Sequence, residues 1–91
     1  MILKVQVYPA MAQVLGVSEF CLEFEGIVVS WSEAQSALCD ELRRMGGSSF
    51  CRGDKLAGPI VALVNGQPAR QGMHPLRDGD TVRLRYVVSG G

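Results

Sequence analysis

Hydrophobic and polar residues alternate along three stretches of the chain, with the period of two that a half-buried β-strand requires. The alternation predicts strands over residues 1–8, 19–25 and 81–88, and an apolar run predicts another over residues 60–64. The first two are separated by a short connection, residues 10–17, so we expect them to pair antiparallel. The run at 60–64 is apolar on both faces, which predicts that it is covered more fully than the other strands.

One amphipathic helix is predicted between the second and third strands. Ser30 followed by Glu33 is a capping-box pattern, which marks a helix start. The glycine pair Gly46-Gly47 would end the helix. Between these ends, apolar side chains recur at helical spacing and would pack against a sheet: Trp31, Ala34, Leu38, Leu42 and Met45.

Turn signals separate the strands in the second half of the chain. Asn65-Gly66 is a strong hairpin signal, Pro68 confines the segment after it to a sheet edge, and Asp78-Gly79-Asp80 turns the chain into the last strand. This order of elements predicts an α+β fold, a mixed sheet of four to five strands with one main helix packed on one face. We expect residues 1–91 to form a single domain.

The end of the chain carries the candidate chemistry. The last strand is followed by Val88, Ser89, Gly90 and Gly91. Glycine has no Cβ, so its backbone passes through channels too narrow for other residues. A terminal carboxylate is ionised at neutral pH and reacts as an electrophile only after activation. We therefore predict that 88–91 is a flexible tail and that its Gly91 carboxyl is activated by a partner; an inert, frayed terminus is the alternative.

Charge and cysteine content narrow the class of protein. Nine basic and nine acidic side chains balance, which gives no indication of nucleic-acid or anionic-membrane binding. Residues 1–7 alternate instead of forming a secretion signal, and no stretch approaches the roughly 18 apolar residues of a membrane helix. Three cysteines without a CxxC spacing fit reduced thiols: Cys21, Cys39 and Cys51. We expect a cytoplasmic protein in which Cys51, placed in a loop, is the most exposed thiol.

Other catalytic or binding sites are not indicated by the sequence. His74 is the only histidine and precedes a proline, as a turn residue does. Asp78 and Asp80 are too few for a calcium loop. Neither a dinucleotide-binding glycine motif nor a phosphate-binding loop is present, so ATP would have to be bound by a partner. We expect no catalytic residue, no metal and no bound cofactor in this chain.

Two runs near the C-terminus form a recognisable pattern: Pro75-Leu76-Arg77-Asp78-Gly79-Asp80-Thr81-Val82 and Val88-Ser89-Gly90-Gly91, with Val64-Asn65-Gly66 upstream. The chain thereby resembles the ubiquitin-like sulfur-carrier family of the MoaD/ThiS type. Residues after the first strand look closer to the MoaD branch: Ala12, Val14, Leu15 and Gly16. The resemblance implies a β-grasp fold.

The resemblance also implies a chemistry. An E1-like adenylating enzyme of the MoeB/ThiF type would use ATP to adenylate the Gly91 carboxyl, and sulfur would replace AMP to leave a thiocarboxylate. Gly90, Ser89 and Val88 would insert into the partner. A sulfur-accepting synthase subunit (MoaE-like) or another acceptor enzyme would receive the sulfur. The protein would be a carrier and no enzyme in its own right.

The acceptor remains open at this point. Tyr86-Val87 stands where molybdopterin-synthase small subunits often carry a proline pair. A molybdopterin-synthase small subunit is the first hypothesis, and a carrier for thiamine, cysteine or another thiolated metabolite is the alternative. A ubiquitin-like modifier that is joined to lysines, and a binding domain with an inert tail, are two further possibilities.

A docking surface is expected on the sheet face opposite the helix. In the last strand, Val82, Leu84 and Tyr86 share one face, and Arg83, Arg85 and Val87 share the other. The open face should carry Lys4, Gln6, Tyr8, Arg83, Arg85 and Val87. The alternative to a docking surface is a face that is simply solvated. Arg85, Tyr86 and Val87 lie nearest the tail and are the docking candidates.

Overall fold

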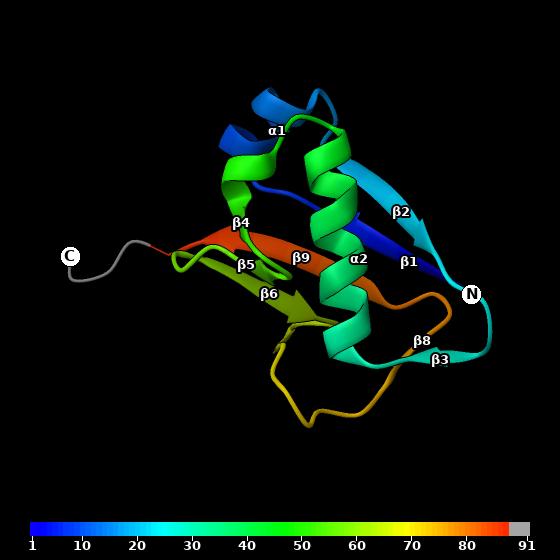
Figure 1. The fold of residues 1–91 in the computed structure, drawn as a ribbon. Coiled ribbons are helices and arrows are strands. Elements are labelled where there is room, and N and C mark those ends of the chain that lie inside the picture. The colour runs from blue at the N-terminus through cyan, green and yellow to red at the C-terminus, as the bar shows by residue number, and fades with distance from the viewer. Residues whose placement is uncertain (88–91) are drawn as a thin grey trace.

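The computed structural model describes residues 1–87 and consists of a twisted sheet crossed on one face by a helix (Figure 1). The elements, in chain order, are β1 (Ile2–Gln6), α1 (Pro9–Leu15), β2 (Glu19–Glu23), β3 (Val28–Val29), α2 (Trp31–Arg44), the 3-10 turn η1 (Ser48–Phe50), β4 (Cys51–Arg52), β5 (Lys55–Leu56), β6 (Ile60–Val64), β7 (Gln67–Pro68), β8 (Leu76–Arg77) and β9 (Thr81–Tyr86).

The main sheet has five strands in the order β2-β1-β9-β6-β7. Strands β1 and β9 pair in parallel, with Val5 opposite Val82, and the other neighbours pair antiparallel. Two small ribbons, β3–β8 and β4–β5, lie outside this sheet. The expected mixed sheet with one main helix on one face is therefore confirmed.

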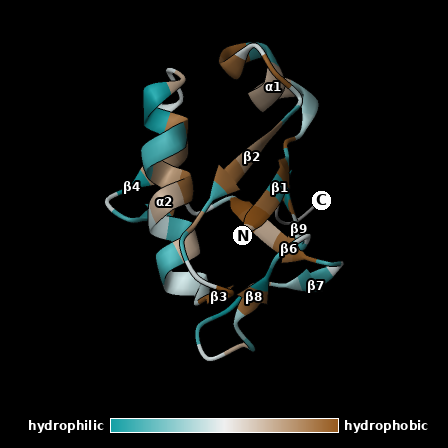
Figure 2. Ribbon diagram, turned by 90° about the vertical axis from the view of Figure 1, so that its right-hand side faces the viewer, coloured by the Kyte–Doolittle hydropathy of each residue, from teal (hydrophilic) through white to brown (hydrophobic). Residues whose placement is uncertain are grey.

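The core lies between the sheet and α2. Buried side chains come from the inner faces of β1, β9 and β6 and from one stripe of α2, and include Leu3, Val5, Val82, Leu84, Ile60, Ala62, Trp31, Ala34, Leu38 and Leu42. In Figure 2 the sheet strands are largely brown, whereas α2 carries both teal and paler residues, as an amphipathic helix does. The helical spacing in the sequence therefore marks the buried face of α2.

Local signals in the sequence fix both ends of α2 and the hairpin after β6. The Glu33 N–H donates to the Ser30 Oγ at 3.1 Å, which caps the helix start as predicted. Asn65 and Gly66 both have positive φ, 50° and 85°, as a type I′ turn requires. Pro68 lies in the edge strand β7, where a residue without an N–H is tolerated.

The connection predicted over residues 10–17 contains a helix that the sequence did not indicate, α1 (Pro9–Leu15). Pro9 occupies the first turn of that helix, where its missing N–H leaves no bond unmade. Met11 and Leu15, four residues apart, are buried against the core, whereas Val14 is 54% exposed. Gly16 ends the helix in the left-handed conformation, with φ of 81°.

Strand β6 is covered more fully than β1, β2 and β9, as predicted, although its outer face is partly open. Ile60, Ala62 and Val64 are buried, but Val61 faces outward and is 38% exposed. No helix of the described chain covers that outer face (Figure 1). The apolar residue at this position is therefore part of the open face of the sheet.

Gly47 sits where a side chain has no room. A Cβ built there would lie 2.8 Å from both Leu15 Cδ2 and Phe50 Cδ2 and 3.1 Å from the Leu42 carbonyl oxygen. We expect Gly47→Ala to lower the free energy of unfolding by about 1–3 kcal/mol, because the neighbours must shift to relieve the overlap. Urea unfolding followed by circular dichroism measures the change.

Gly58→Ala is the matched control for this substitution. A Cβ at Gly58 meets no atom within 4 Å, and its φ is not positive. We expect this variant to stay within about 0.5 kcal/mol of the wild type or to gain slightly. Equal stabilities for the two variants would contradict the tight packing of Leu15 and Phe50 around Gly47.

Candidate functional site

The end of β9, after which the predicted tail begins in the sequence, lies in the middle of the main sheet. Strand β9 lies between β1 and β6, and its last residue, Tyr86, pairs with Ile60. One residue further, the Val87 N–H donates to the Pro59 carbonyl at 2.8 Å. Val88, Ser89, Gly90 and Gly91, which the sequence singled out, lie outside the described residues.

Three aromatic rings pack side by side at this point. Tyr8 lies 5.9 Å from Tyr86 and 6.5 Å from Phe50, measured between ring centroids. Burial raises the pKa of Tyr8, and the neighbouring Tyr86 raises it further. We call Phe50, Tyr8 and Tyr86 the aromatic row. It links η1 and the start of α1 to the end of β9.

The aromatic row changes two expectations. Tyr8 is the N-cap residue of α1 and lies outside strand β1, whereas the sequence placed it on a strand. Tyr86, expected to share a face with Val82 and Leu84, is 54% exposed and packs against Tyr8, whereas Val82 and Leu84 are buried. Phe50 was not identified from the sequence, since its contact with Tyr8 joins segments that are distant along the chain.

Basic side chains stand on the open face of the sheet. Lys4, Arg83 and Arg85 are exposed there, and Arg83 Nε and Nη2 both donate to Gln6 Oε1, at 3.3 and 3.2 Å. Within residues 1–87, neither Arg83 nor Arg85 lies within 4.0 Å of a carboxylate oxygen. The two guanidinium groups are therefore available to carboxylates of a partner.

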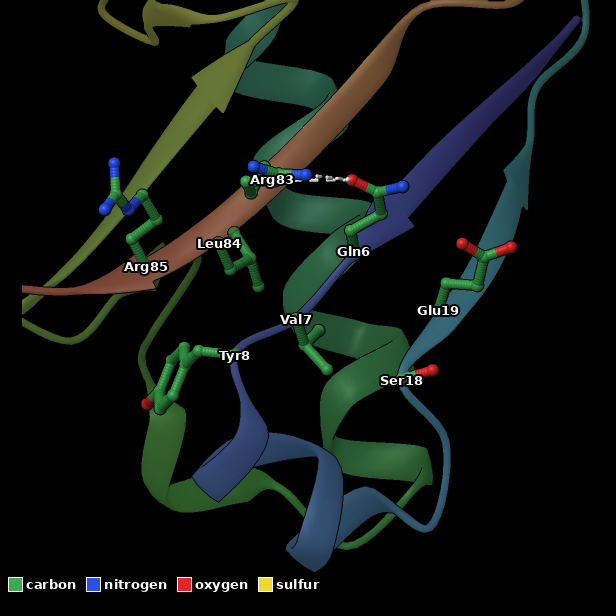
Figure 3. Close-up of a pocket in the computed structure, with 8 residues that line it drawn as sticks. All are labelled: Gln6, Val7, Tyr8, Ser18, Glu19, Arg83, Leu84 and Arg85. Carbon is green, nitrogen blue, oxygen red and sulfur yellow. Dashed lines mark hydrogen bonds between the residues drawn. The ribbon is translucent and has the colours of Figure 1, made fainter.

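A shallow hollow of about 350 Å³ runs along this face (Figure 3). It is lined by Gln6, Val7, Tyr8, Ser18, Glu19, Arg83, Leu84 and Arg85. The lining residues come from the end of β1 and the link to α1, from the start of β2 and the residue before it, and from β9, so the hollow lies next to the end of β9. Val87, another docking candidate, is 50% exposed just beyond it.

The aspartates of the C-terminal motif brace the fold. Asp80 Oδ1 accepts from Asn65 Nδ2 at 3.0 Å, and Asp80 Oδ2 accepts from the Arg77 N–H at 2.9 Å. Asp78 Oδ1 accepts from the Ile2 N–H at 2.7 Å. Both residues precede β9, at the end of the strand opposite Val87. Hydrogen bonds of Asn65 with Asp80 and Thr81 therefore join the hairpin turn after β6 to the turn before β9.

The remaining candidates carry no clustered chemistry. His74 is exposed in a bend between β7 and β8. Within residues 1–87 there is no group of three histidine, cysteine or acidic side chains placed to hold a metal ion. Among the same residues, no helix has the length and apolar character needed to cross a membrane.

The thiols are distributed differently from the sequence expectation. Cys21 is exposed on the outer face of β2, Cys39 is buried in α2, and Cys51 is partly exposed. The expectation that Cys51 is the most exposed thiol is therefore wrong. It begins strand β4, which packs against α2, instead of lying in an open loop.

No protein-family model and no curated protein matches the sequence. Several solved structures match the fold over nearly the whole chain. SAMP1 from Haloferax volcanii has 24% identity and a TM-score of 0.75, with 100% of both chains covered. Small archaeal modifier protein 1 from Methanosarcina acetivorans has 26% identity and a TM-score of 0.68, covering 99% of this chain and 96% of its own. A protein described as molybdopterin converting factor, subunit 1, from Pyrococcus furiosus has 25% identity and a TM-score of 0.65, covering 97% and 99%.

Two further matches are structures of complexes. One is the complex of subunits 1 and 2 of the molybdopterin-converting factor from Helicobacter pylori 26695, with 19% identity, a TM-score of 0.61 and 100% of both chains covered. The other is the BexX/CysO complex from Amycolatopsis orientalis, with 22% identity and a TM-score of 0.62, covering 98% and 99%. At these low sequence identities, the two matches show that the fold is shared.

The fold and its neighbours define a class: the chain is a ubiquitin-like β-grasp protein. Within that class, its structural neighbours are the ubiquitin-like sulfur carriers and modifiers of the MoaD/ThiS family. The resemblance drawn from the C-terminal motif and the expected β-grasp fold are both confirmed.

Proposed function

We propose that this protein is a sulfur carrier whose Gly91 carboxyl becomes a thiocarboxylate. The supporting observation is the full-length match to small β-grasp carriers and modifiers, combined with a sequence in which Gly90-Gly91 follow a central, anchored strand by a few residues. Such a strand would hold the start of the tail at a fixed point on the surface, while the glycines give the carboxyl a narrow approach to a partner's active site.

The proposed reaction begins with activation by an E1-like enzyme of the MoeB/ThiF type. A Gly91 carboxylate oxygen attacks the α-phosphorus of ATP, and pyrophosphate leaves. A sulfur nucleophile then attacks the acyl adenylate carbonyl, and AMP leaves. The partner supplies the ATP site and the nucleophile. This chain contributes the carboxyl, the slender tail and the docking face, and it acts as a carrier without catalysis of its own.

A MoaE-like synthase subunit is the first choice for the acceptor. Subunit 1 of the molybdopterin converting factor from Pyrococcus furiosus and the two-subunit complex from Helicobacter pylori support this choice by their shared fold. Tyr86-Val87 in place of a proline pair keeps a thiamine, cysteine or other thiolated-metabolite pathway as the alternative. ATP-dependent activation would take place in the cytoplasm.

A ubiquitin-like modifier is the second candidate. The structural match to small archaeal modifier protein 1 favours this candidate. A modifier and a sulfur carrier would use the same glycine tail and the same acyl adenylate, so the tail is compatible with either function. In a modifier, the Gly91 carbonyl would be transferred to a lysine amine on another protein. Gly91-terminated branched peptides in digests of cell extracts would identify this route.

Intact-protein mass spectrometry tests the proposal. The protein is incubated with ATP, a sulfide or persulfide donor and the E1-like enzyme of its own source. We expect a mass gain equal to the replacement of one oxygen by sulfur, and none after deletion of Gly91. No adenylate and no thiocarboxylate, with an enzyme that is active on another carrier, would overturn the proposal.

The docking face gives a separate prediction. We expect Arg85→Glu to weaken binding to the E1-like enzyme about tenfold, because reversing an exposed charge near an interface repels a partner's carboxylates. Isothermal titration calorimetry measures the affinity. Arg52→Glu reverses an exposed arginine on β4, away from the hollow, and should bind as the wild type does. Equal affinities for all three proteins would remove Arg85 from the docking face.

A further inference from the structure

The β4–β5 hairpin is attached to helix α2 on both sides of Cys39. One turn before Cys39, Gln35 Oε1 accepts from the Leu56 N–H at 3.0 Å. One turn after it, Arg43 Nη2 donates to the Gly53 carbonyl in the hairpin turn. Residues four apart on a helix share a face, so Gln35, Cys39 and Arg43 all face the hairpin.

Cys51 is the hairpin residue that meets this helical face. It pairs across the hairpin with Leu56, the residue held by Gln35. Cys51 packs against the hydrophobic core, and its strand β4 contacts α2. Its influence on the pKa of Cys39 indicates that the two thiols are neighbours. Cys39 is fully buried, whereas Cys51 is partly exposed. The arrangement places one sheltered thiol beneath one that solvent reaches.

The two thiols differ in reactivity. Burial, and after it the neighbouring Cys51, raises the pKa of Cys39 to about 12. Cys39 is therefore protonated at neutral pH and poorly nucleophilic, because the thiolate is the reacting form. Of these two thiols, Cys51 is the one that an oxidant in solution can reach.

We infer that Cys39 and Cys51 form a reversible intramolecular disulfide, a redox modification site within the carrier domain. A low-molecular-weight disulfide, such as glutathione disulfide, is the oxidant. The Cys51 thiolate attacks one of its sulfurs, which makes a mixed disulfide and releases one glutathione. Cys39 then loses its proton and attacks the Cys51 sulfur, which releases the second glutathione. Two protein thiols are oxidised and one small disulfide is reduced to two thiols.

The position of Cys39 favours its attack on the Cys51 sulfur. Cys39 lies on the face of α2 that contacts the hairpin, so it stays close to Cys51 when Cys51 carries glutathione. The buried thiol is already beside the sulfur it must attack, so ring closure requires little rearrangement. The bond would tie α2 to the hairpin, next to Phe50 of the aromatic row.

Cys21 provides the internal control, because it is exposed on β2. The Cys21→Ser protein is incubated with glutathione disulfide and analysed by intact mass and peptide mapping. We expect the loss of two hydrogens, a Cys39–Cys51 cross-linked peptide and no lasting glutathione adduct, all reversed by dithiothreitol. The oxidised form should melt at a higher temperature, by on the order of 10 °C, because the bond restricts the unfolded chain.

Two variants in the Cys21→Ser background separate the steps. Cys39→Ala, which keeps a small apolar side chain in the core, should hold a stable glutathione adduct on Cys51. Cys51→Ser should take no adduct, because Cys39 is buried. A lasting adduct on Cys51 when Cys39 is present would overturn the inference. So would two unmodified thiols under conditions in which Cys21 of the wild type is fully glutathionylated.

Discussion

Asp80→Ala is expected to lower the free energy of unfolding by about 2 kcal/mol. The carboxylate accepts hydrogen bonds from the Asn65 side chain and from the Arg77 backbone, at 3.0 and 2.9 Å. Asn65 in turn accepts from the Thr81 N–H at the start of β9. Alanine removes both acceptor oxygens. Because the site is open to solvent, the loss of stability should be smaller than for two buried hydrogen bonds to a charged group.

Urea unfolding monitored by circular dichroism measures this change, with an unaltered slope showing that the folded state is retained. Asp54→Ala is the control, since Asp54 lies in the exposed β4–β5 turn and its carboxylate is not among the hydrogen-bond acceptors within residues 1–87. Asp80→Asn keeps one carbonyl oxygen and should fall between the wild type and Asp80→Ala. A stability of Asp80→Ala equal to that of Asp54→Ala would show that the motif does not brace the sheet.

Gly90→Val should reduce the rate of thiocarboxylate formation at least 100-fold, on the order expected when reacting groups are displaced by about 1 Å. Under the proposed function, the tail would enter a narrow channel in the activating enzyme, and a branched side chain next to Gly91 would make the chain too wide for it. Single-turnover mass spectrometry with saturating ATP measures the rate.

Ser89→Ala is the matched control, because it changes the neighbouring residue without adding bulk. We expect its rate to stay within about threefold of the wild type, because the substitution removes only a hydroxyl group. Melting temperatures of both variants should match the wild type. Rapid sulfur loading of the Gly90→Val protein would show that a wide channel accepts this tail and would remove the reason for glycine at this position.

The main sheet and helix α2 were predictable because their signals are local. The Ser30–Glu33 pair fixes one helix end, and Asn65-Gly66 fixes the hairpin after β6. Such patterns depend on neighbours within a few residues, which any sequence window contains. Strand ends were less accurate, because β1 stops at Gln6 and β2 stops at Glu23, short of their alternating patterns.

Helix α1 was missed because tertiary contacts determine it. Pro9 indicated the end of a strand, but the same fixed φ also suits the first turn of a helix. The burial of Met11 and Leu15 decides between the two, and it depends on a core built by distant segments. Local propensity gives way to packing at such positions.

The candidate site was predictable only in part, for the same reason. Lys4, Arg83 and Arg85 follow from alternation, and all three are exposed on the open face as expected. The contacts of Tyr8 with Phe50 and Tyr86 were not predictable, since each joins elements that no local pattern relates. The proximity of Cys39 and Cys51 likewise depends on how the hairpin folds back onto α2.

The parallel pairing of β1 with β9 has a consequence for how the chain folds during synthesis. Strand β1 is the first to leave the ribosome, yet it stays without its central partner until β9 has also emerged. Contacts between such distant segments slow folding, because a long loop must close before they form. The sheet is therefore completed only when β9, the strand that precedes Gly90-Gly91 in the sequence, is in place. A chain truncated before β9 would lack both these glycines and the central strand of the sheet.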